Sequence, residues 1–202
     1  MLITYKCTKC GKINTVEVDD TINLTGNQEL LKTILDNSKF NFKCVDCNTE
    51  HNVIYDVLFQ DDNEKFYVKI NSSNELLTLV SKDDYKIRIV KDLNEANEKL
   101  RTFYYRLDDR VIEIIKYMIK DDLEKNNESL KVNEIYFFRY AQGYLEFVIF
   151  NKEAYLGIMK FSLAGYKEVK HKHKDNFDNN IQIVNENFVL NILSKPNKNN
   201  CA

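Results

Sequence analysis

Two pairs of cysteines have a spacing that suits metal chemistry. Cys7 and Cys10 lie in YKCTKCGK, and Cys44 and Cys47 lie in CVDCNTEH, so each pair follows the pattern C-x-x-C. Two intervening residues let both sulfurs of one turn face the same ion, and four thiolates suit tetrahedral Zn²⁺ with Zn–S bonds of about 2.3 Å. The spacing therefore predicts one structural Zn²⁺ site with these four cysteines as its ligands.

The residues that follow each pair also fit a metal-binding turn. Gly11 follows the first pair, where such a turn commonly needs a left-handed backbone, and glycine adopts that conformation without a steric penalty. Asn48 holds the same place after the second pair, and asparagine is the next most tolerant residue type there. Both pairs are therefore predicted to form the same kind of turn, called a knuckle below.

Alternative uses of four thiols stay open at the level of sequence. An iron–sulfur cluster also takes four cysteines, and a redox C-x-x-C of the thioredoxin type uses one pair in a βαβ context. His51 follows Cys47 by four residues. Because four sulfurs saturate a tetrahedral ion, we expect His51 to be a surface or strand residue. A closed site of four cysteines also leaves no position for water, so we do not expect catalysis by this metal.

The charge of the chain disfavours a nucleic-acid-binding domain. The 202-residue chain has a formal net charge of −2, whereas nucleic-acid-binding domains usually carry a basic field. The basic run KEVKHKHK at 167–174 is expected to be a solvated helix end, in which His171 and His173 would share a face only if the segment were extended.

The expected compartment follows from what the sequence lacks. It contains no apolar run of about 18 residues that would span a membrane, and its start does not read as a secretory signal. We therefore expect a cytoplasmic protein with reduced thiols, which favours metal over disulfides for the paired cysteines. Cys201, in the polar segment KPNKNNCA, is expected to be a free, exposed thiol.

The first 70 residues read as an elaborated zinc ribbon. Short β-prone runs flank both cysteine pairs, and NQELLKTILDN has the apolar spacing of an amphipathic helix. Strands are expected at 2–5, 16–18, 40–43, 52–58 and 66–70, with further candidates at 76–80 and 85–90.

A helical section follows this ribbon. Apolar residues recur every three or four positions from 93 to 123, and Asp108 and Asp109 can cap a second helix within that run. The segment EIYFFRYAQGYLEFVIFN then predicts a β-hairpin that turns at Gln142 and Gly143.

The remaining segments alternate between strand and helix. AYLGIMKF reads as a strand, Ser162 as the cap of a helix, 181–184 as a strand, and the residues from about Glu186 as a short helix. The fold class is therefore α+β: an elaborated zinc ribbon, a helical section and a small C-terminal α+β unit. The expected domains are 1–125 and 130–195.

The chain resembles the CpXC family, zinc-ribbon-like proteins of bacteria and archaea named for two C-P-x-C motifs. The resemblance rests on YKCTKCGK, INLTGNQELLKTILDNSKFNFKCVDCN, VLFQDDNEKFYVKI and KLRTFYYRLDDRVIEIIKYMIKDDL, in this order. It implies metal binding by two knuckles and carries no established activity. Thr8 and Val45 replace the prolines, which stiffen the turn and are not ligands. Asn48 replaces a glycine, and Gln60, beside Asp61, stands where the family often has histidine.

Three functional hypotheses of different kinds fit these features. The favoured one is a non-enzymatic interaction module whose partner is another protein or a second copy. A nucleic-acid-binding ribbon is the first alternative, supported by lysines near the knuckles (Lys6, Lys9, Lys12 and Lys43) and opposed by the net charge. The second alternative is an enzyme of unknown reaction with a site between the two units, in which Asp61 or a tyrosine takes part. No nucleotide-binding, zinc-protease or serine-hydrolase motif supports it.

Overall fold

The computed structural model describes residues 1–71, 84–127, 130–152 and 154–194. The strand predicted at 76–80 and the thiol of Cys201 lie outside these residues. No helix in the described ranges has the length and hydropathy needed to cross a membrane.

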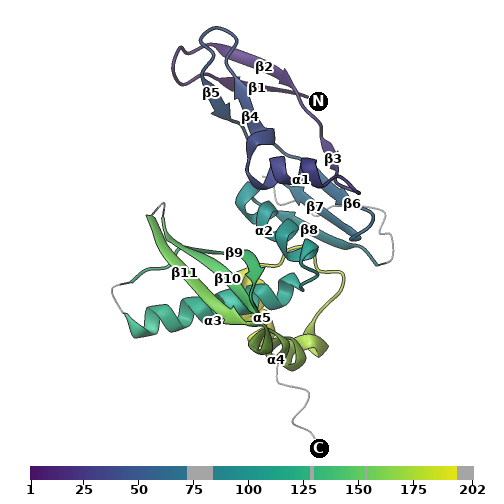
Figure 1. The fold of residues 1–202 in the computed structure, drawn as a ribbon, viewed down its shortest axis with the longest axis vertical. Coiled ribbons are helices and arrows are strands. Elements are labelled where there is room, and N and C mark those ends of the chain that lie inside the picture. Colours follow the sequence, from purple (N-terminus) through teal and green to yellow (C-terminus); the bar gives the residue numbers. More distant parts are fainter. Residues whose placement is uncertain (72–83, 128–129, 153, 195–202) are drawn as a thin grey trace, which may run out of the picture. The chain divides into compact units, whose positions relative to one another are not determined.

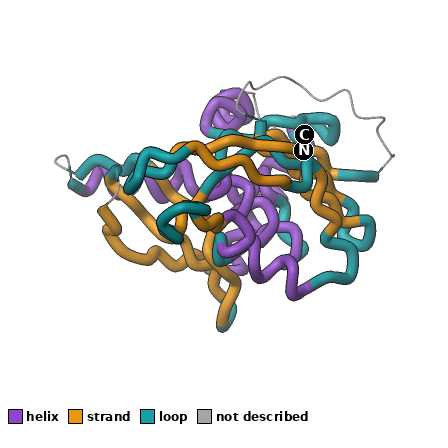
Figure 2. Tube along the Cα trace, turned by 90° about the horizontal axis from the view of Figure 1, so that it is seen from above, coloured by secondary structure: helices purple, strands orange, loops and turns teal. Residues whose placement is uncertain are grey.

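The structure contains both helices and sheets, as the α+β prediction requires (Figure 1 and Figure 2). In the described residues the α-helices are α1 Gln28–Leu35, α2 Leu93–Tyr104, α3 Asp109–Asn126, α4 Leu163–His173 and α5 Glu186–Leu193, with 3₁₀ turns at Ser38–Phe40 and Lys174–Asn176. The strands are β1 Leu2–Lys6, β2 Ile13–Glu17, β3 Thr21–Asn23, β4 Asn41–Lys43, β5 Glu50–Asn52, β6 Leu58–Asp61, β7 Phe66–Ile70, β8 Lys86–Val90, β9 Glu134–Ala141, β10 Tyr144–Asn151 and β11 Ala154–Ser162.

The chain forms two compact units, Met1–Asn97 and Glu98–Ala202, and the division falls inside α2. Helix α3 contributes buried residues to the core of the second unit, together with β9, β10, α4 and α5. The domain limits predicted from the sequence, 1–125 and 130–195, concern independent folding and stay a prediction.

In the first unit, each cysteine pair sits in the loop of a small antiparallel hairpin. Strands β1 and β2 pair from Leu2 opposite Glu17 to Lys6 opposite Ile13, and the loop between them holds the first knuckle. Strands β4 and β5 pair from Asn41 opposite Asn52 to Lys43 opposite Glu50, and their loop holds the second knuckle. Two hairpins, which Figure 1 shows as β1–β2 and β4–β5, thus carry the two knuckles.

The rest of the first unit is a four-stranded sheet with the order β3-β6-β7-β8. Helix α1 begins where the Asn27 side chain accepts a hydrogen bond from the Leu30 N–H at 3.0 Å, an N-cap of the usual kind. Phe40, at the end of the first 3₁₀ turn, is fully buried and contacts the rings of Tyr55 and Phe59 at centroid distances of 5.6 and 6.5 Å. This aromatic core supports the entry into the second knuckle, because β4 starts directly after Phe40.

The second unit packs helices on one three-stranded antiparallel sheet, β11-β10-β9. The helical run breaks where expected, since the Asp108 side chain caps α3 by accepting from the Arg110 N–H. Gln142 and Gly143 turn the β9–β10 hairpin with φ angles of 50° and 82°. Ser162 Oγ accepts from the Gly165 N–H at 3.0 Å and caps α4. Each of these predicted turns and caps is confirmed.

Five charged side chains lie in the interior of the second unit, where the helical pattern of the sequence predicts only apolar residues. The Lys99 ammonium lies 3.2 Å from the Asp109 carboxylate, and that of Lys116 lies 2.9 Å from Glu98 and 3.1 Å from Glu113. The Glu98 carboxylate also accepts the Phe137 backbone N–H at 2.7 Å. Burial raises the pKa of Glu98, against the pull of Lys116. Pairing of this kind is what allows charges to stay inside a core.

Two predicted strands are wrong. The run 52–58 is strand only at its ends, in β5 and β6, although its alternation reports burial correctly at Tyr55 and Val57. Between the strands the backbone makes isolated hydrogen bonds, such as Val53 N–H to Phe40 O at 2.9 Å, instead of a ladder. The run 181–184 has no regular structure, and its Val184 carbonyl accepts from Lys99 Nζ at 3.2 Å.

Candidate metal centre

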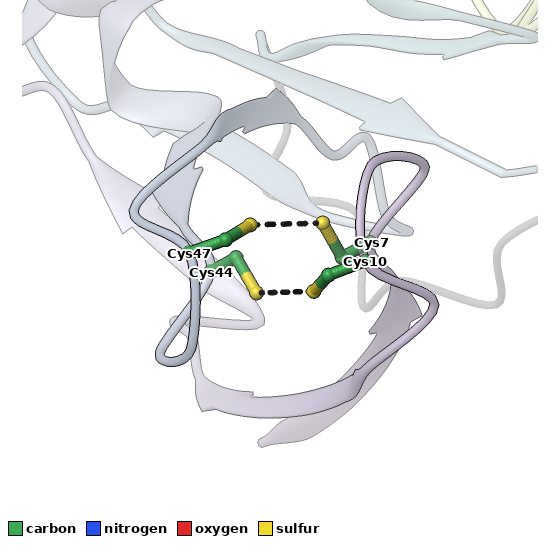
Figure 3. Close-up of side chains that lie close together, drawn as sticks. All are labelled: Cys7, Cys10, Cys44 and Cys47. Atoms are coloured by element: carbon green, nitrogen blue, oxygen red, sulfur yellow. Dashed lines mark hydrogen bonds between the residues drawn. The ribbon is translucent and has the colours of Figure 1, made fainter.

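The fold brings all four cysteines of the two pairs together (Figure 3). The four Sγ atoms lie within 4.8 Å of one another, and among the described residues no other group of at least three histidine, cysteine or carboxylate side chains could hold a metal ion. Two contacts run between the knuckles, with 3.6 Å from Cys7 Sγ to Cys47 Sγ and 3.6 Å from Cys10 Sγ to Cys44 Sγ. All four thiols are free of disulfide bonds.

These distances fit a tetrahedral ion. A tetrahedron with metal–sulfur bonds of about 2.3 Å has S–S edges of about 3.8 Å. The 3.6 Å contacts are close to that edge and far too long for a disulfide. The donor set, four sulfurs with no carboxylate, is the one that Zn²⁺ and iron–sulfur clusters take in proteins.

The backbone of one knuckle repeats in the other. The Gly11 N–H donates to Cys7 O at 3.0 Å, and the Asn48 N–H donates to Cys44 O at 2.9 Å. The first cysteine of each pair donates its own N–H five residues onward, to Lys12 O at 2.8 Å and to Thr49 O at 2.9 Å. The predicted left-handed residues are confirmed, with φ of 77° at Gly11 and 55° at Asn48.

Each knuckle also supplies a side chain to the sulfur of the other. Asn14 and His51 both stand four residues after the second cysteine of their pair. Asn14 Nδ2 donates to Cys44 Sγ at 3.6 Å, and His51 Nε2 lies 3.2 Å from Cys7 Sγ. Such outer contacts fix the orientation of metal ligands and adjust their basicity. His51 is a strand residue, as predicted, and it lies beside the sulfurs instead of among them.

Asn14 ties the two knuckles together most closely. Its side chain is 2% exposed. Its amide group donates to Lys12 O at 3.1 Å and to Cys44 Sγ, while its Oδ1 accepts the Val45 N–H at 3.0 Å. The sequence does show that Asn14 and His51 stand at the same spacing after their cysteine pairs. That each residue contacts a sulfur of the opposite knuckle is visible only in the geometry of the hairpins.

A family model described as CpXC protein matches residues 5–116, which is more than half of the 202-residue chain. The chain belongs to the CpXC family. No curated protein and no solved structure matches the chain.

The CpXC match covers both knuckles and ends inside α3. The two family prolines that Thr8 and Val45 replace are not needed for the turn, since both knuckles keep their paired backbone hydrogen bonds without them. Gln60 and Asp61 lie in β6. The buried Asp61 carboxylate accepts the N–H groups of Asn63 and Glu64 at 2.8 and 3.0 Å, which is a turn-forming arrangement.

Hydrogen bonds separate the thiols of the CpXC knuckles by their acidity. The Cys47 N–H lowers the pKa of Cys44 to about 6, helped by Asp46 N–H and by Asn14. The Thr49 hydroxyl, 3.3 Å from Cys47 Sγ, lowers the pKa of Cys47. Although the Lys12 N–H favours its thiolate, desolvation and the three neighbouring thiols raise the pKa of Cys10 to about 12. Sulfurs this close cannot all carry charge without a cation, which is the electrostatic demand that a divalent ion meets.

An aromatic group borders the sulfurs. The Tyr5 ring lies 5.4 Å from the His51 ring and 6.3 Å from the Phe42 ring, centroid to centroid. Burial raises the pKa of Tyr5, with smaller contributions from Cys44, Cys7 and Cys47. Tyr5 lies in β1, within the strand predicted at 2–5, and nothing in the sequence pattern marks it as a residue of the site.

The two histidines of KEVKHKHK do not meet. Both lie in α4, where His171 is exposed and His173 is buried. The run 167–174 does form the positively charged end of a helix, as predicted.

Proposed function

We propose that this CpXC protein binds one Zn²⁺ ion through Cys7, Cys10, Cys44 and Cys47, and that the ion holds the two hairpins in one arrangement. The observation that carries the proposal is the convergence of four sulfurs within 4.8 Å from two knuckles of the same backbone design. When bound, zinc supplies a tetrahedral cross-link without redox chemistry.

The chain's own residues prepare the ligands. Asn14 and His51 orient one sulfur each, and the backbone N–H groups of the knuckles favour the thiolate forms that a metal requires. Four sulfurs leave no position for a water ligand, so the proposed role of the ion is structural.

Elemental analysis of the purified, reduced protein tests this assignment. One equivalent of zinc per chain, with an X-ray absorption spectrum that fits four sulfurs at about 2.3 Å, is the expected result. If the protein contained iron and absorbed visible light, the site would be assigned to an iron–sulfur cluster and not to zinc. Well under one equivalent of metal with reduced cysteines would refute a metal centre.

We further propose that the rigid ribbon serves as an interaction module for another protein or for a second copy of the chain. Exposed apolar side chains near the knuckles support this proposal: Ile13 is 67% exposed where β2 begins, and Val45 is 72% exposed inside the second knuckle. Apolar residues at such rigid turns are costly to leave in water and suit a protein surface better than an anionic polymer.

The lysines near the knuckles give the nucleic-acid alternative less support than their number suggests. The Lys12 ammonium lies 3.6 Å from the Asp46 carboxylate, and that of Lys43 lies 3.4 Å from Glu50. Each pair cancels local positive charge that phosphate binding would need.

Two measurements separate the hypotheses. Sedimentation velocity over a wide range of protein concentration is expected to show self-association that Ile13→Ser with Val45→Ser weakens, if the partner is a second copy. Retention on single- or double-stranded nucleic acid that falls with added salt would instead favour the nucleic-acid alternative. Neither substitution replaces a cysteine, and zinc content measured on the same samples controls for loss of the ribbon.

A further inference from the structure

One difference between the two knuckles changes the surroundings of a sulfur. Thr49 and Lys12 both stand two residues after the second cysteine of their pair, and both carbonyls accept the N–H of the first cysteine. The Thr49 hydroxyl lies 3.3 Å from Cys47 Sγ. The Lys12 side chain turns to the Asp46 carboxylate, at 3.6 Å, and is half exposed. Cys10 therefore has no counterpart of the hydroxyl that Cys47 has.

The other three sulfurs each have a side-chain neighbour that can donate a hydrogen bond. Those neighbours are His51 for Cys7, Asn14 for Cys44 and Thr49 for Cys47. For Cys10, the described residues provide the backbone N–H of Lys12 and no side-chain donor other than the neighbouring thiols. Cys10 is also the exposed member of the group, whereas Cys7 and Cys44 are buried and Cys47 is half-buried.

Both differences act in the same direction. A hydrogen bond to a thiolate withdraws electron density from its lone pairs and makes it a weaker nucleophile. Attack by a reagent from solvent further requires access, so the modification of cysteines follows thiolate character and exposure together. Metal binding keeps all four sulfurs as thiolates, which leaves access and hydrogen bonding to decide among them.

We propose that Cys10 is the modification site of this centre, the thiolate that alkylating agents and peroxides reach first. The inference rests on the proposed zinc centre. With a peroxide, a lone pair of Cys10 Sγ attacks one peroxide oxygen, the S–O bond forms, the O–O bond breaks, and hydroxide leaves. The sulfur is oxidised by two electrons to a sulfenic acid, and the peroxide is reduced.

A second sulfur then completes the step. Cys44 Sγ lies 3.6 Å from Cys10 Sγ, so it is positioned to displace hydroxide from the sulfenic acid. The S–S bond forms, the S–O bond breaks, and the leaving hydroxide takes up a proton as water. A metal ion held by four sulfurs retains two after this step and is released. The centre would thereby couple a peroxide to the loss of its own cross-link.

The test is pulse labelling of the zinc-loaded, full-length Cys201→Ser protein with a limiting amount of iodoacetamide, followed by peptide mass spectrometry. Cys10 is expected to be labelled first, ahead of Cys47 by about three- to tenfold, the rate ratio that one hydrogen bond of ordinary strength corresponds to. Equal labelling of Cys10 and Cys47 would overturn the inference.

Two pairs of variants keep the comparison sharp. Lys12→Thr places a hydroxyl where Thr49 has one and is expected to slow the labelling of Cys10, while Lys12→Val removes the same charge without adding a hydroxyl and is expected not to slow it. Thr49→Val is expected to expose Cys47 to labelling, and Thr49→Ser to protect it. Equal protection by Lys12→Thr and Lys12→Val would refute the role of the hydroxyl.

Peroxide treatment tests the second step. A chromophoric chelator is expected to report zinc release, and mass spectrometry a disulfide between Cys10 and Cys44. A disulfide within one knuckle would contradict the proposed order. Zinc content measured before labelling tells apart a failure of the zinc proposal from a failure of the Cys10 proposal. A chain without zinc refutes the zinc centre, whereas a zinc-loaded chain with uniform labelling refutes only the role of Cys10.

Discussion

Replacing Asn14 should weaken metal binding although Asn14 is not a ligand. Its side chain donates to Cys44 Sγ and to Lys12 O and accepts the Val45 N–H, all in a buried position. Asn14→Ala leaves the Val45 N–H without this acceptor and the Cys44 thiolate without this donor. Loss of such an outer contact typically costs 10- to 100-fold in metal affinity, or about 1.4–2.8 kcal/mol.

A second substitution at the same position separates the two halves of the side chain. Asn14→Asp keeps an oxygen to accept the Val45 N–H, but it places a carboxylate oxygen where Nδ2 now lies, 3.6 Å from Cys44 Sγ. Repulsion between the carboxylate and the thiolate should make Asn14→Asp the weaker binder of the two variants. Asp has the same shape as Asn, so a loss of affinity in Asn14→Asp cannot come from packing.

The assay is competition with a chromophoric zinc chelator at constant pH, with circular dichroism at saturating zinc to confirm folding. Asn52→Ala is the matched control, because Asn52 is an exposed asparagine of β5 that donates to Asn41 Oδ1 at 3.0 Å and contacts no sulfur. Wild-type affinity in both Asn14 variants would refute the view that this residue links the knuckles. Equal losses in Asn14→Ala and Asn14→Asp would refute the electrostatic part of the argument.

Three further outcomes are expected. Cys44→Ser leaves three sulfurs, so hydrogen exchange should rise strongly in residues 1–70 and stay unchanged in the second unit; a rise throughout the chain would mean that both units fold as one. Ser162→Ala should cost the protein about 0.5–2 kcal/mol in chemical denaturation through loss of the α4 cap, with Ser162→Asp as the retaining control; equal losses would argue against capping. Burial, aided by Lys172, lowers the pKa of His173. Below about pH 6.5 the unfolded state therefore binds more protons at this position, and the free energy of unfolding should fall as the pH is lowered. His173→Gln should flatten this pH dependence, and an unaltered slope in the variant would mean that other groups cause the dependence.

The sequence predicted local structure best where a particular residue type favours a particular backbone conformation. Gly11 and Asn48 mark left-handed turns, Asp108 marks a helix start, and Gln142 with Gly143 marks a hairpin. Each of these signals acts over four or five residues, so neighbours in the sequence contain all the information it needs. Each C-x-x-C pair belongs to the same group, because its spacing is a property of one knuckle. The convergence of the two pairs, with Cys10 and Cys44 34 residues apart, depends on the tertiary fold.

The predictions that failed, and the contacts that were missed, depend on residues far apart in the sequence. Tyr55 and Val57 alternate as a strand would and are buried as a strand would be, but a ladder also needs a neighbour that only the tertiary fold supplies. Asn14 reads as an ordinary polar residue ahead of the strand expected at 16–18, and only β2 brings it to the opposite knuckle. Lys99 and Glu98 read as the polar face of a helix, and their burial depends on partners in α3 and β9.

Because the sulfurs are divided between two hairpins, the metal site cannot form until both hairpins have been synthesised. Cys10 and Cys44 are 34 residues apart. At about 5–20 residues per second, a ribosome adds the second pair about 2–7 s after the first. During that interval Cys7 and Cys10 have no partner sulfurs, and Asn14 has no knuckle to bind. The nascent chain therefore carries two unprotected thiols for seconds, and the cross-link can close only once β5 has followed the second knuckle out of the ribosome.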